Sequence, residues 1–118
     1  MDEGLGKRLF DFAIRVIEYC RKLPKGKEYD IIKTQLIKAA SSAGANYEEA
    51  QGAISKPDFI NKINISLKEI RESNYWLRII NGIMRADNEL NLLIKESEEL
   101  KKILGSIYSK SSKSKNQK

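Results

Sequence analysis

Apolar side chains recur at steps of three and four residues in four segments of the chain, approximately residues 5–22, 28–51, 55–85 and 88–109. This spacing places the apolar side chains of each segment on one face of a helix. The stretches between the segments are short, and short connections join helices that run antiparallel. The pattern therefore predicts an all-α fold, an antiparallel up-down four-helix bundle, over residues 1–109.

Local signals mark the ends of these helices. Pro24 ends the first helix because proline lacks a backbone donor, and Gly52 is placed as the cap of the second. Ser55 can accept a hydrogen bond from the amide of Asp58 while Asp58 reaches back, which is a capping box. Asp87 can cap the fourth helix. Residues 110–118 are rich in lysine and serine and lack apolar side chains, so we expect a disordered lysine-rich tail.

The second helix has unusually small side chains in its middle, at residues 39–45. Small side chains let two helix backbones approach closely, either within the bundle or between subunits. Gly44 costs about 1 kcal/mol of helix propensity relative to alanine, and a close contact would explain it. Further apolar residues lie off the main stripes of the first two helices, namely Phe10, Ile14, Ile31 and Ile37. This surplus of apolar surface predicts a homo-oligomer.

The composition excludes several classes of function. The chain has no histidine and a single cysteine, Cys20. Histidine metal sites, histidine acid–base catalysis and an intrachain disulfide are therefore excluded. No run approaches the roughly 18 apolar residues of a membrane span, and the acidic first residues do not resemble a signal peptide. We expect a cytoplasmic protein that does not associate with membranes.

The net charge of +6 is unevenly distributed, with the basic excess on the first helix, its following loop and the tail. A basic surface attracts nucleic acid or an acidic protein surface, whereas lysine-rich termini also serve only solubility. Both interpretations stay open. The candidate nucleic-acid-binding residues are Lys7, Arg8, Arg15, Arg21, Lys22, Lys25, Lys27, Lys110, Lys113, Lys115 and Lys118.

A polar stripe borders the apolar stripe of the third helix, and the second helix offers two further polar residues. The polar residues of this set are Asn46, Glu49, Lys62, Glu69, Glu72 and Trp76. A bundle could bring the carboxylates together, as a metal site or an acid–base pair requires. We favour a structural role, because Lys62, Lys68 and Arg71 are close enough to pair with the acids. Loss of Glu69 would then destabilise the fold. Trp76 serves either as an anchor of a subunit interface or as core. We predict no catalytic, cofactor-binding or metal-binding residues.

Two long motifs resemble the four helix bundle proteins, also called the 23S ribosomal RNA intervening-sequence protein family. The first motif covers residues 35–51, Gln-Leu-Ile-Lys-Ala-Ala-Ser-Ser-Ala-Gly-Ala-Asn-Tyr-Glu-Glu-Ala-Gln. The second comprises residues 55–62, 67–73 and 75–77, with Pro57 as a small departure. The likeness extends over about residues 7–108. It implies an antiparallel four-helix bundle that assembles as a ring-like homopentamer. Some members are encoded within insertions in ribosomal RNA genes. A related branch comprises the accessory variability determinant proteins, which assist the reverse transcriptases of diversity-generating retroelements. The family has no accepted catalytic residues.

Two hypotheses from different classes follow. The first is a non-enzymatic, homo-oligomeric scaffold whose basic surface binds RNA, DNA or a nucleoprotein partner such as a reverse transcriptase. The alternative is a module for protein–protein interaction or regulation without nucleic acid. An enzyme that uses Glu49, Glu69 and Glu72 is a third and weaker hypothesis.

Overall fold

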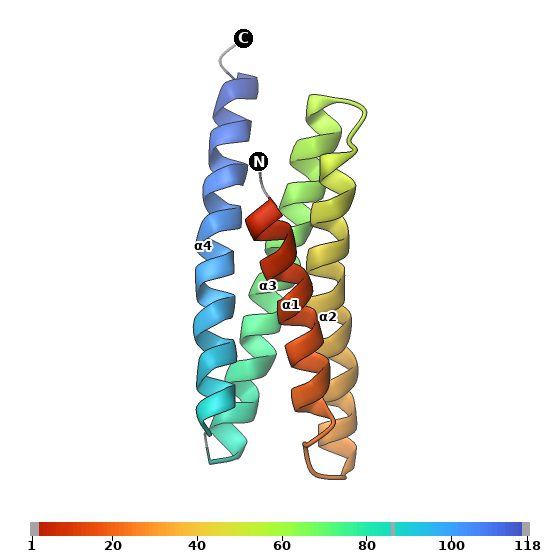
Figure 1. The fold of residues 1–118 in the computed structure, drawn as a ribbon, viewed down its shortest axis with the longest axis vertical. Helices are drawn as coiled ribbons and strands as arrows, with labels where there is room; N and C mark the ends of the chain where they lie inside the picture. Colours follow the sequence, from red (N-terminus) through yellow and green to blue (C-terminus); the bar gives the residue numbers. More distant parts are fainter. Residues whose placement is uncertain (1–2, 86, 117–118) are drawn as a thin grey trace.

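The computed structural model describes residues 3–85 and 87–116 and confirms the predicted all-α bundle. Its helices are α1 (Glu3–Cys20), α2 (Lys27–Gln51), α3 (Lys56–Ile83) and α4 (Asn88–Asn116). They run alternately down and up in a bundle of 52 × 23 × 20 Å (Figure 1). The beginning of α1 and the end of α4 therefore lie at the end of the bundle opposite the α1–α2 loop. Among the described helices none is both long and apolar enough to cross a membrane.

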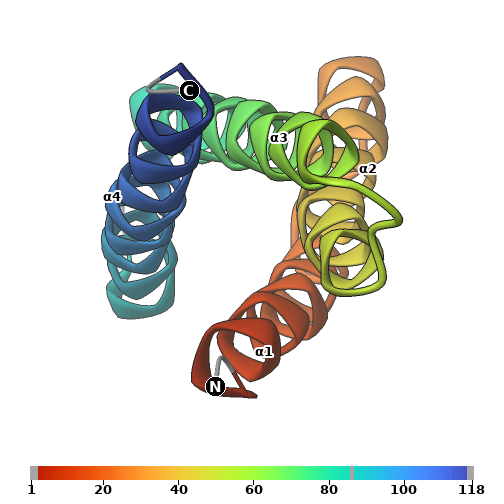
Figure 2. The same cartoon turned by 90° about the horizontal axis from the view of Figure 1, so that it is seen from above.

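The helices pack in chain order, and α1 also contacts α4. Seen from above, α3 lies on the opposite side of the bundle from α1 (Figure 2). The contact between α2 and α3 is the most extensive, and the contact between α1 and α4 is the smallest. Consequently α3 is held firmly on both sides, whereas α1 depends mainly on α2.

The predicted apolar stripes form the core. Leu9, Phe12 and Val16 of α1 are completely buried, as are Leu36, Ile70 and Leu93 of the other helices. Stripe residues nearer the edges of the core are only partly buried, namely Tyr29, Phe59, Met84, Ile94, Ile103 and Ile107. The sequence did not indicate that polar side chains share this core, namely Ser66, Ser73, Asn74 and Ser97. Ser66 Oγ donates to the carbonyl oxygen of Ala43 at 2.7 Å, which joins α3 to α2 by a buried hydrogen bond. Such bonds satisfy groups that would otherwise be costly to bury.

The predicted caps are confirmed at three helix ends. Ser55 Oγ accepts a hydrogen bond from the amide of Asp58 at 3.2 Å, and Asp58 Oδ2 accepts one from the amide of Ile54 at 3.3 Å. Asp87 Oδ1 accepts one from the amide of Leu90 at 2.7 Å. The amide of Gly52 closes α2 by donating to the carbonyl of Glu49 at 3.1 Å.

Helix α4 is longer than the apolar pattern predicted. It continues to Asn116, so residues 110–116 are helical where a disordered tail was expected, and residues 117–118 lie outside the described part of the chain. The segment contains no proline and no glycine after Gly105, and lysine is a good helix former. An apolar stripe is therefore not required for one or two further turns after a helix has formed.

The small residues of α2 face α1 at the level of Gly44. A Cβ atom added to Gly44 would lie 3.6 Å from Leu9 Cβ and 3.7 Å from the Leu9 carbonyl oxygen. The close crossing predicted for residues 39–45 therefore occurs within one chain at this point. These distances are ordinary van der Waals contacts, so the crossing has room for a methyl group and does not by itself explain the glycine.

We expect Gly44→Ala to stabilise the fold, because alanine gains about 1 kcal/mol of helix propensity and its methyl group fits. The melting temperature should rise by about 3–6 °C for a domain of this size. Gly44→Leu should instead cost about 1–3 kcal/mol, because its larger side chain would overlap Leu9. Thermal unfolding followed by circular dichroism measures both changes. A Gly44→Ala variant that unfolds at a lower temperature would show that the contact between Gly44 and Leu9 is too tight for a methyl group.

Candidate interaction surfaces

A shallow apolar groove lies between α1 and the small residues of α2. It has a volume of about 310 Å³, and its lining includes Phe10, Ile14, Ile17, Gly44 and Ala45. Phe10 is 60% exposed and Ile14 is 42% exposed, which confirms that they lie off the core stripe. Small side chains on α2 leave this space beside the larger side chains of α1. We call this feature the α1–α2 groove.

A second apolar groove lies between the beginning of α2 and the end of α3. It has a volume of about 390 Å³ and is lined mainly by Tyr29, Ile31, Trp76, Ile79 and Ile83. Trp76 is half-buried, packs against the core and also lines this groove, so its role at a subunit interface stays a prediction. Its indole Nε1 donates to Glu72 Oε2 at 3.2 Å.

The polar stripe of α3 does not join α2 in one polar cluster. Lys62 approaches Asp58 at 4.0 Å on its own helix, and Asn46 Nδ2 donates to the carbonyl oxygen of Ser42 at 2.9 Å. Glu49 and Glu72 are exposed. Within residues 3–85 and 87–116, no group of three or more histidine, cysteine or acidic residues is placed to hold a metal ion.

Glu69 is half-buried and forms no ion pair with another described residue, contrary to the expected structural pairing. Burial raises the pKa of its carboxyl group, and the nearby Glu72 raises it further. Lys68 and Lys38 act in the opposite direction but are outweighed. The structure therefore places Glu69 where its ionised form is unfavourable.

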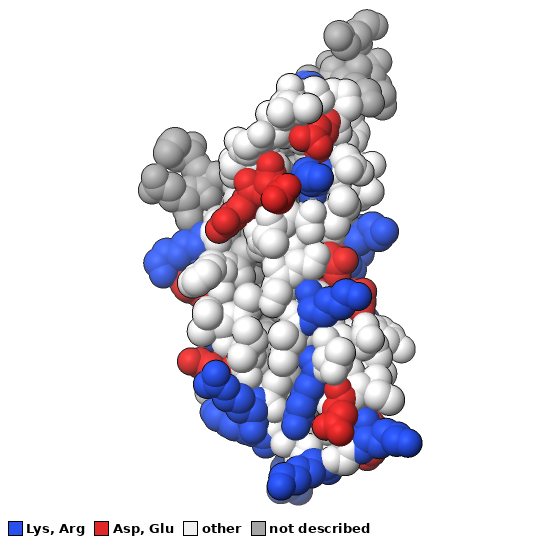
Figure 3. Space-filling view, turned by 90° about the vertical axis from the view of Figure 1, so that its right-hand side faces the viewer, with Lys and Arg blue, Asp and Glu red and all other residues white. Residues whose placement is uncertain are grey.

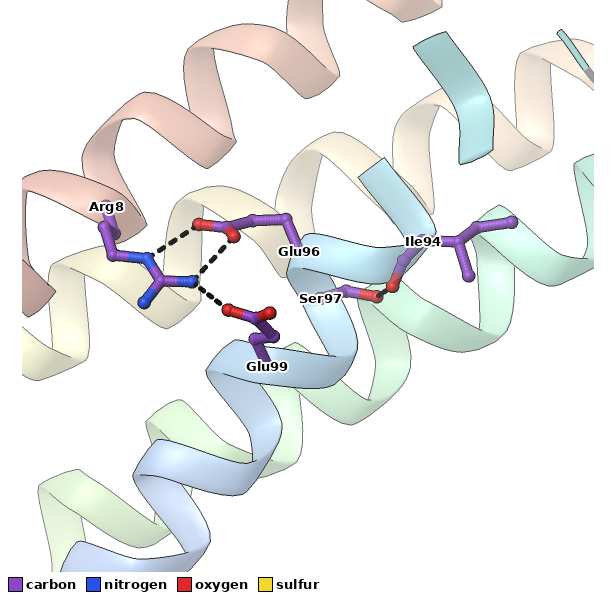
Figure 4. Close-up of polar contacts among 5 residues, drawn as sticks. All are labelled: Arg8, Ile94, Glu96, Ser97 and Glu99. Carbon is purple, nitrogen blue, oxygen red and sulfur yellow. Dashed lines mark hydrogen bonds and ion pairs between the residues drawn. The ribbon is translucent and has the colours of Figure 1, made fainter. Parts of the chain in front are cut away.

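Three of the predicted nucleic-acid-binding residues form ion pairs within the protein, namely Lys7, Arg8 and Lys22. Arg8 donates two hydrogen bonds to Glu96 of α4, from Nε to Oε2 at 3.0 Å and from Nη2 to Oε1 at 2.7 Å (Figure 4). Its Nη2 also donates to Glu99 Oε1 at 2.9 Å. These hydrogen bonds raise the pKa of Arg8 further above its already high value. Lys7 pairs with Asp11 at 2.8 Å. Arg8 therefore contributes to the contact between α1 and α4.

Further polar contacts join the lower end of α1 to the beginning of α4. Lys22 pairs with Glu89 at 2.9 Å, and the Tyr19 hydroxyl donates a long hydrogen bond to Asp87 at 3.4 Å. Burial, followed by the charge of Asp87, raises the pKa of Tyr19 to about 12. The neighbouring Cys20 is buried, and its burial raises the pKa of the thiol to about 11.

The remaining basic candidates form no ion pairs in the described part of the chain. Arg21, Lys25 and Lys27 are exposed around the α1–α2 loop, and Arg15 is half-buried above them. Basic side chains gather toward the lower end of the face in Figure 3, and acidic ones lie mainly above them. Lys110 and Lys113 are exposed on the last turns of α4, at the opposite end. The Lys115 side chain and Lys118 lie outside the described residues.

The sequence interpretation considered Lys68 and Arg71 only as partners of the acids and did not name Arg78 or the basic row on the outer face of α3. Lys68, Arg71 and Arg78 are exposed, as is Tyr75. Their spacing of three, four and three residues could have revealed them, because it places all four on one side of the helix.

Comparisons with known proteins agree on one family. Residues 5–106 match the family model described as 23S rRNA-intervening sequence protein. A crystal structure from Bacteroides thetaiotaomicron, described as a protein of unknown function from the S23 ribosomal protein family, is 31% identical. The match covers 88% of this chain and 97% of that chain, with a TM-score of 0.80. The comparison with curated proteins gives no match.

We expect Glu69→Gln to stabilise the protein at pH 7, because glutamine keeps the shape of the side chain and removes an unfavourable charge. The folded carboxyl has a pKa above the ordinary value of 4.5. Its penalty is therefore complete above the folded pKa and disappears as the pH falls below 4.5. Urea unfolding should show a gain for Glu69→Gln at pH 7 and little difference at pH 4.

The exposed Glu49 provides the control, and Glu49→Gln should change the unfolding midpoint little at either pH. A loss of stability in Glu69→Gln at pH 7 would restore the original expectation that Glu69 stabilises the fold through a charged partner.

Proposed function

The chain belongs to the family of 23S rRNA-intervening sequence proteins, and from this membership we propose that it is a homo-oligomeric scaffold that acts by binding rather than by catalysis. Copies of the chain associate through the α1–α2 groove. The basic surface of the assembly binds nucleic acid or a nucleoprotein partner. The ring-like pentamer implied by the family resemblance is the expected form of the assembly.

The exposed apolar side chains of the α1–α2 groove carry this proposal. Phe10 and Ile14 lie next to each other on one face of α1, and each exposes about half of its surface to water. Removing apolar surface from water is worth about 25 cal/mol per Å². A second copy of the chain is a partner present at the same concentration, and its own apolar surface can cover this one.

The basic residues around the α1–α2 loop support the nucleic-acid part of the proposal. Arg21, Lys25 and Lys27 are exposed and without ion pairs in the described residues, in a chain of net charge +6. An oligomer repeats this surface several times, and several weak contacts on one polyanion strengthen binding far beyond a single contact.

The alternative is an interaction module without nucleic acid, and a specific observation favours it. Lys7, Arg8 and Lys22 belong to the predicted basic surface, yet each is paired with a carboxylate of the same chain. Pairing reduces the positive charge that a phosphate backbone would meet. The two functions share the same assembly and differ only in their response to RNA or DNA.

Replacing both Phe10→Asp and Ile14→Asp should shift the protein from oligomer to monomer. The two charges would be placed in a groove that the proposal buries between subunits, where unpaired charges are costly. Sedimentation equilibrium at micromolar concentration measures the mass directly. Leu92→Asp is the control, because Leu92 is 49% exposed on α4 and lies outside the groove.

The control should retain the mass of the wild type. A monomeric wild type under these conditions would contradict the scaffold proposal, and an oligomer that survives the double replacement would place its interface elsewhere.

The full-length protein should bind RNA or DNA at low salt, and the binding should weaken steeply as salt rises. Each neutralised phosphate of a single strand contributes about −0.7 to the slope of log affinity against log salt. Filter binding over a salt series measures this slope, and Lys25→Gln with Lys27→Gln should make it less steep. If the wild type retains neither RNA nor DNA at low salt, the nucleic-acid part is wrong and the interaction module remains.

A further inference from the structure

The outer face of α3 carries an exposed basic row with one aromatic residue. Lys68, Arg71, Tyr75 and Arg78, which we call the α3 stripe, follow one another at three- and four-residue steps. That spacing keeps them on one side of the helix over about 15 Å. None of its three basic residues has an ion pair among the described residues. The exposed Glu72 lies at the edge of the stripe, one turn from Lys68, and accepts a hydrogen bond from Trp76 without forming an ion pair with the stripe.

Arg78 is held in place by a chain of hydrogen bonds that begins in the core. Asn74 is 5% exposed. Its Oδ1 accepts from Arg78 Nε at 2.8 Å, and its Nδ2 donates to Ser97 Oγ of α4 at 2.8 Å. Ser97 Oγ in turn donates to the carbonyl oxygen of Ile94 at 2.7 Å, as Figure 4 shows. A buried network therefore sets the direction of an exposed guanidinium group.

The guanidinium group of Arg78 also rests on an aromatic ring. Its central carbon lies 5.7 Å from the centroid of Tyr75, which fits a cation–π contact. Trp76 meets the same Tyr75 ring edge-on, with ring centroids 5.5 Å apart. Arg78 Nε is engaged, and its two terminal nitrogens have no protein partner in the described structure. An arginine that is already oriented loses little further conformational entropy when its two terminal nitrogens bind a phosphate.

Tyr75 gives the stripe a second kind of contact. It is 50% exposed, and it lies beside arginine side chains that can neutralise phosphates. Unpaired nucleobases stack on exposed aromatic rings and on guanidinium planes, whereas bases in a duplex are already stacked on each other. The combination of arginine, tyrosine and arginine on one helix face therefore fits a single strand better than a duplex.

Helix α4 extends the positive surface at the same height. The hydrogen bond between Asn74 and Ser97 aligns these two residues on antiparallel helices. Arg71 lies three residues before Asn74, and Lys101 lies four residues after Ser97, so both lie about one turn in the same direction from that bond. Lys101 is half-buried and adds a charge next to the stripe.

We propose that the α3 stripe is a binding track for single-stranded nucleic acid, with phosphates on Arg71 and Arg78 and a base stacked against Tyr75 or the Arg78 guanidinium. The inference rests on the nucleic-acid part of the proposed function and specifies where the strand lies. It assigns the main contact to α3 rather than to the α1–α2 loop or the end of α4.

The test uses the full-length protein and a fluorescein-labelled 20-nucleotide poly(U) RNA, with binding followed by fluorescence anisotropy over a salt series. Arg71→Gln combined with Arg78→Gln should weaken binding at low salt by roughly tenfold. It should also reduce the steepness of the salt dependence by about 1.4, because two phosphate contacts are lost. Tyr75→Leu should weaken binding by about fivefold or more without changing the slope, because it removes stacking but no charge.

The matched control is Lys33→Gln combined with Lys38→Gln, which removes the same charge from α2 instead of α3. Circular dichroism verifies that every variant remains folded. If the α3 and control pairs weaken binding equally, only net charge matters and the proposal is wrong. A duplex that binds as tightly as the single strand, with no effect of Tyr75→Leu, would also overturn it.

The outcomes separate this inference from the proposed function. RNA binding that survives loss of Arg71 and Arg78 but falls in the Lys25→Gln, Lys27→Gln variant overturns the track and supports the loop surface. A wild type that does not bind the RNA at any salt concentration overturns both.

Discussion

Helix α3 is fixed to both of its neighbours by hydrogen bonds inside the core, and the rest of the bundle depends on this constraint. Ser66 bonds to the backbone of α2 at Ala43, and Asn74 bonds to Ser97 of α4. Rows of leucine and isoleucine tolerate small sliding of one helix along another, because similar apolar contacts re-form. A buried polar group left without its partner costs roughly 1–3 kcal/mol, so these bonds favour one register. Once the register is set, the Asn74 network can hold Arg78 in a defined orientation.

Helix α1 is attached differently. It presents Leu9, Phe12 and Val16 to the core, and it touches α2 where the side chains of that helix are smallest. Its contact with α4 relies on charged and polar side chains near the surface, above all the fork of Arg8 on Glu96. The Arg8–Glu96 pair is bidentate and partly buried, whereas the exposed Lys22–Glu89 pair contributes little and is weakened by salt. The same small residues that bring α1 close to α2 also leave the groove beside Phe10, so the packing of this helix and the proposed assembly surface have one origin.

The sequence was sufficient for the architecture, because the apolar period and the helix caps are local properties. Ser55, Gly52 and Asp87 act at the helix ends that their types predict. What could not be derived were partners that are distant in sequence: Arg8 meets Glu96 only after the bundle has formed, and no local pattern distinguishes it from Lys25. The predicted end of α4 was wrong for a related reason, because the apolar stripe ends near residue 109 whereas the helix continues to Asn116. The role of Asn74 was also hidden, because a polar residue on a core face has meaning only when Ser97 lies opposite.

Cys20 links the geometry of the lower end of the bundle to its dynamics. It is the only thiol of the chain, it is 1% exposed, and burial raises its pKa to about 11. A thiol in this state reacts with an alkylating reagent only when the end of α1 moves away from the core and the thiolate can form. The native sequence thus contains a reporter of local opening at a single position. Its modification rate is a kinetic measure of how often α1 separates from the core, without any label or engineered residue.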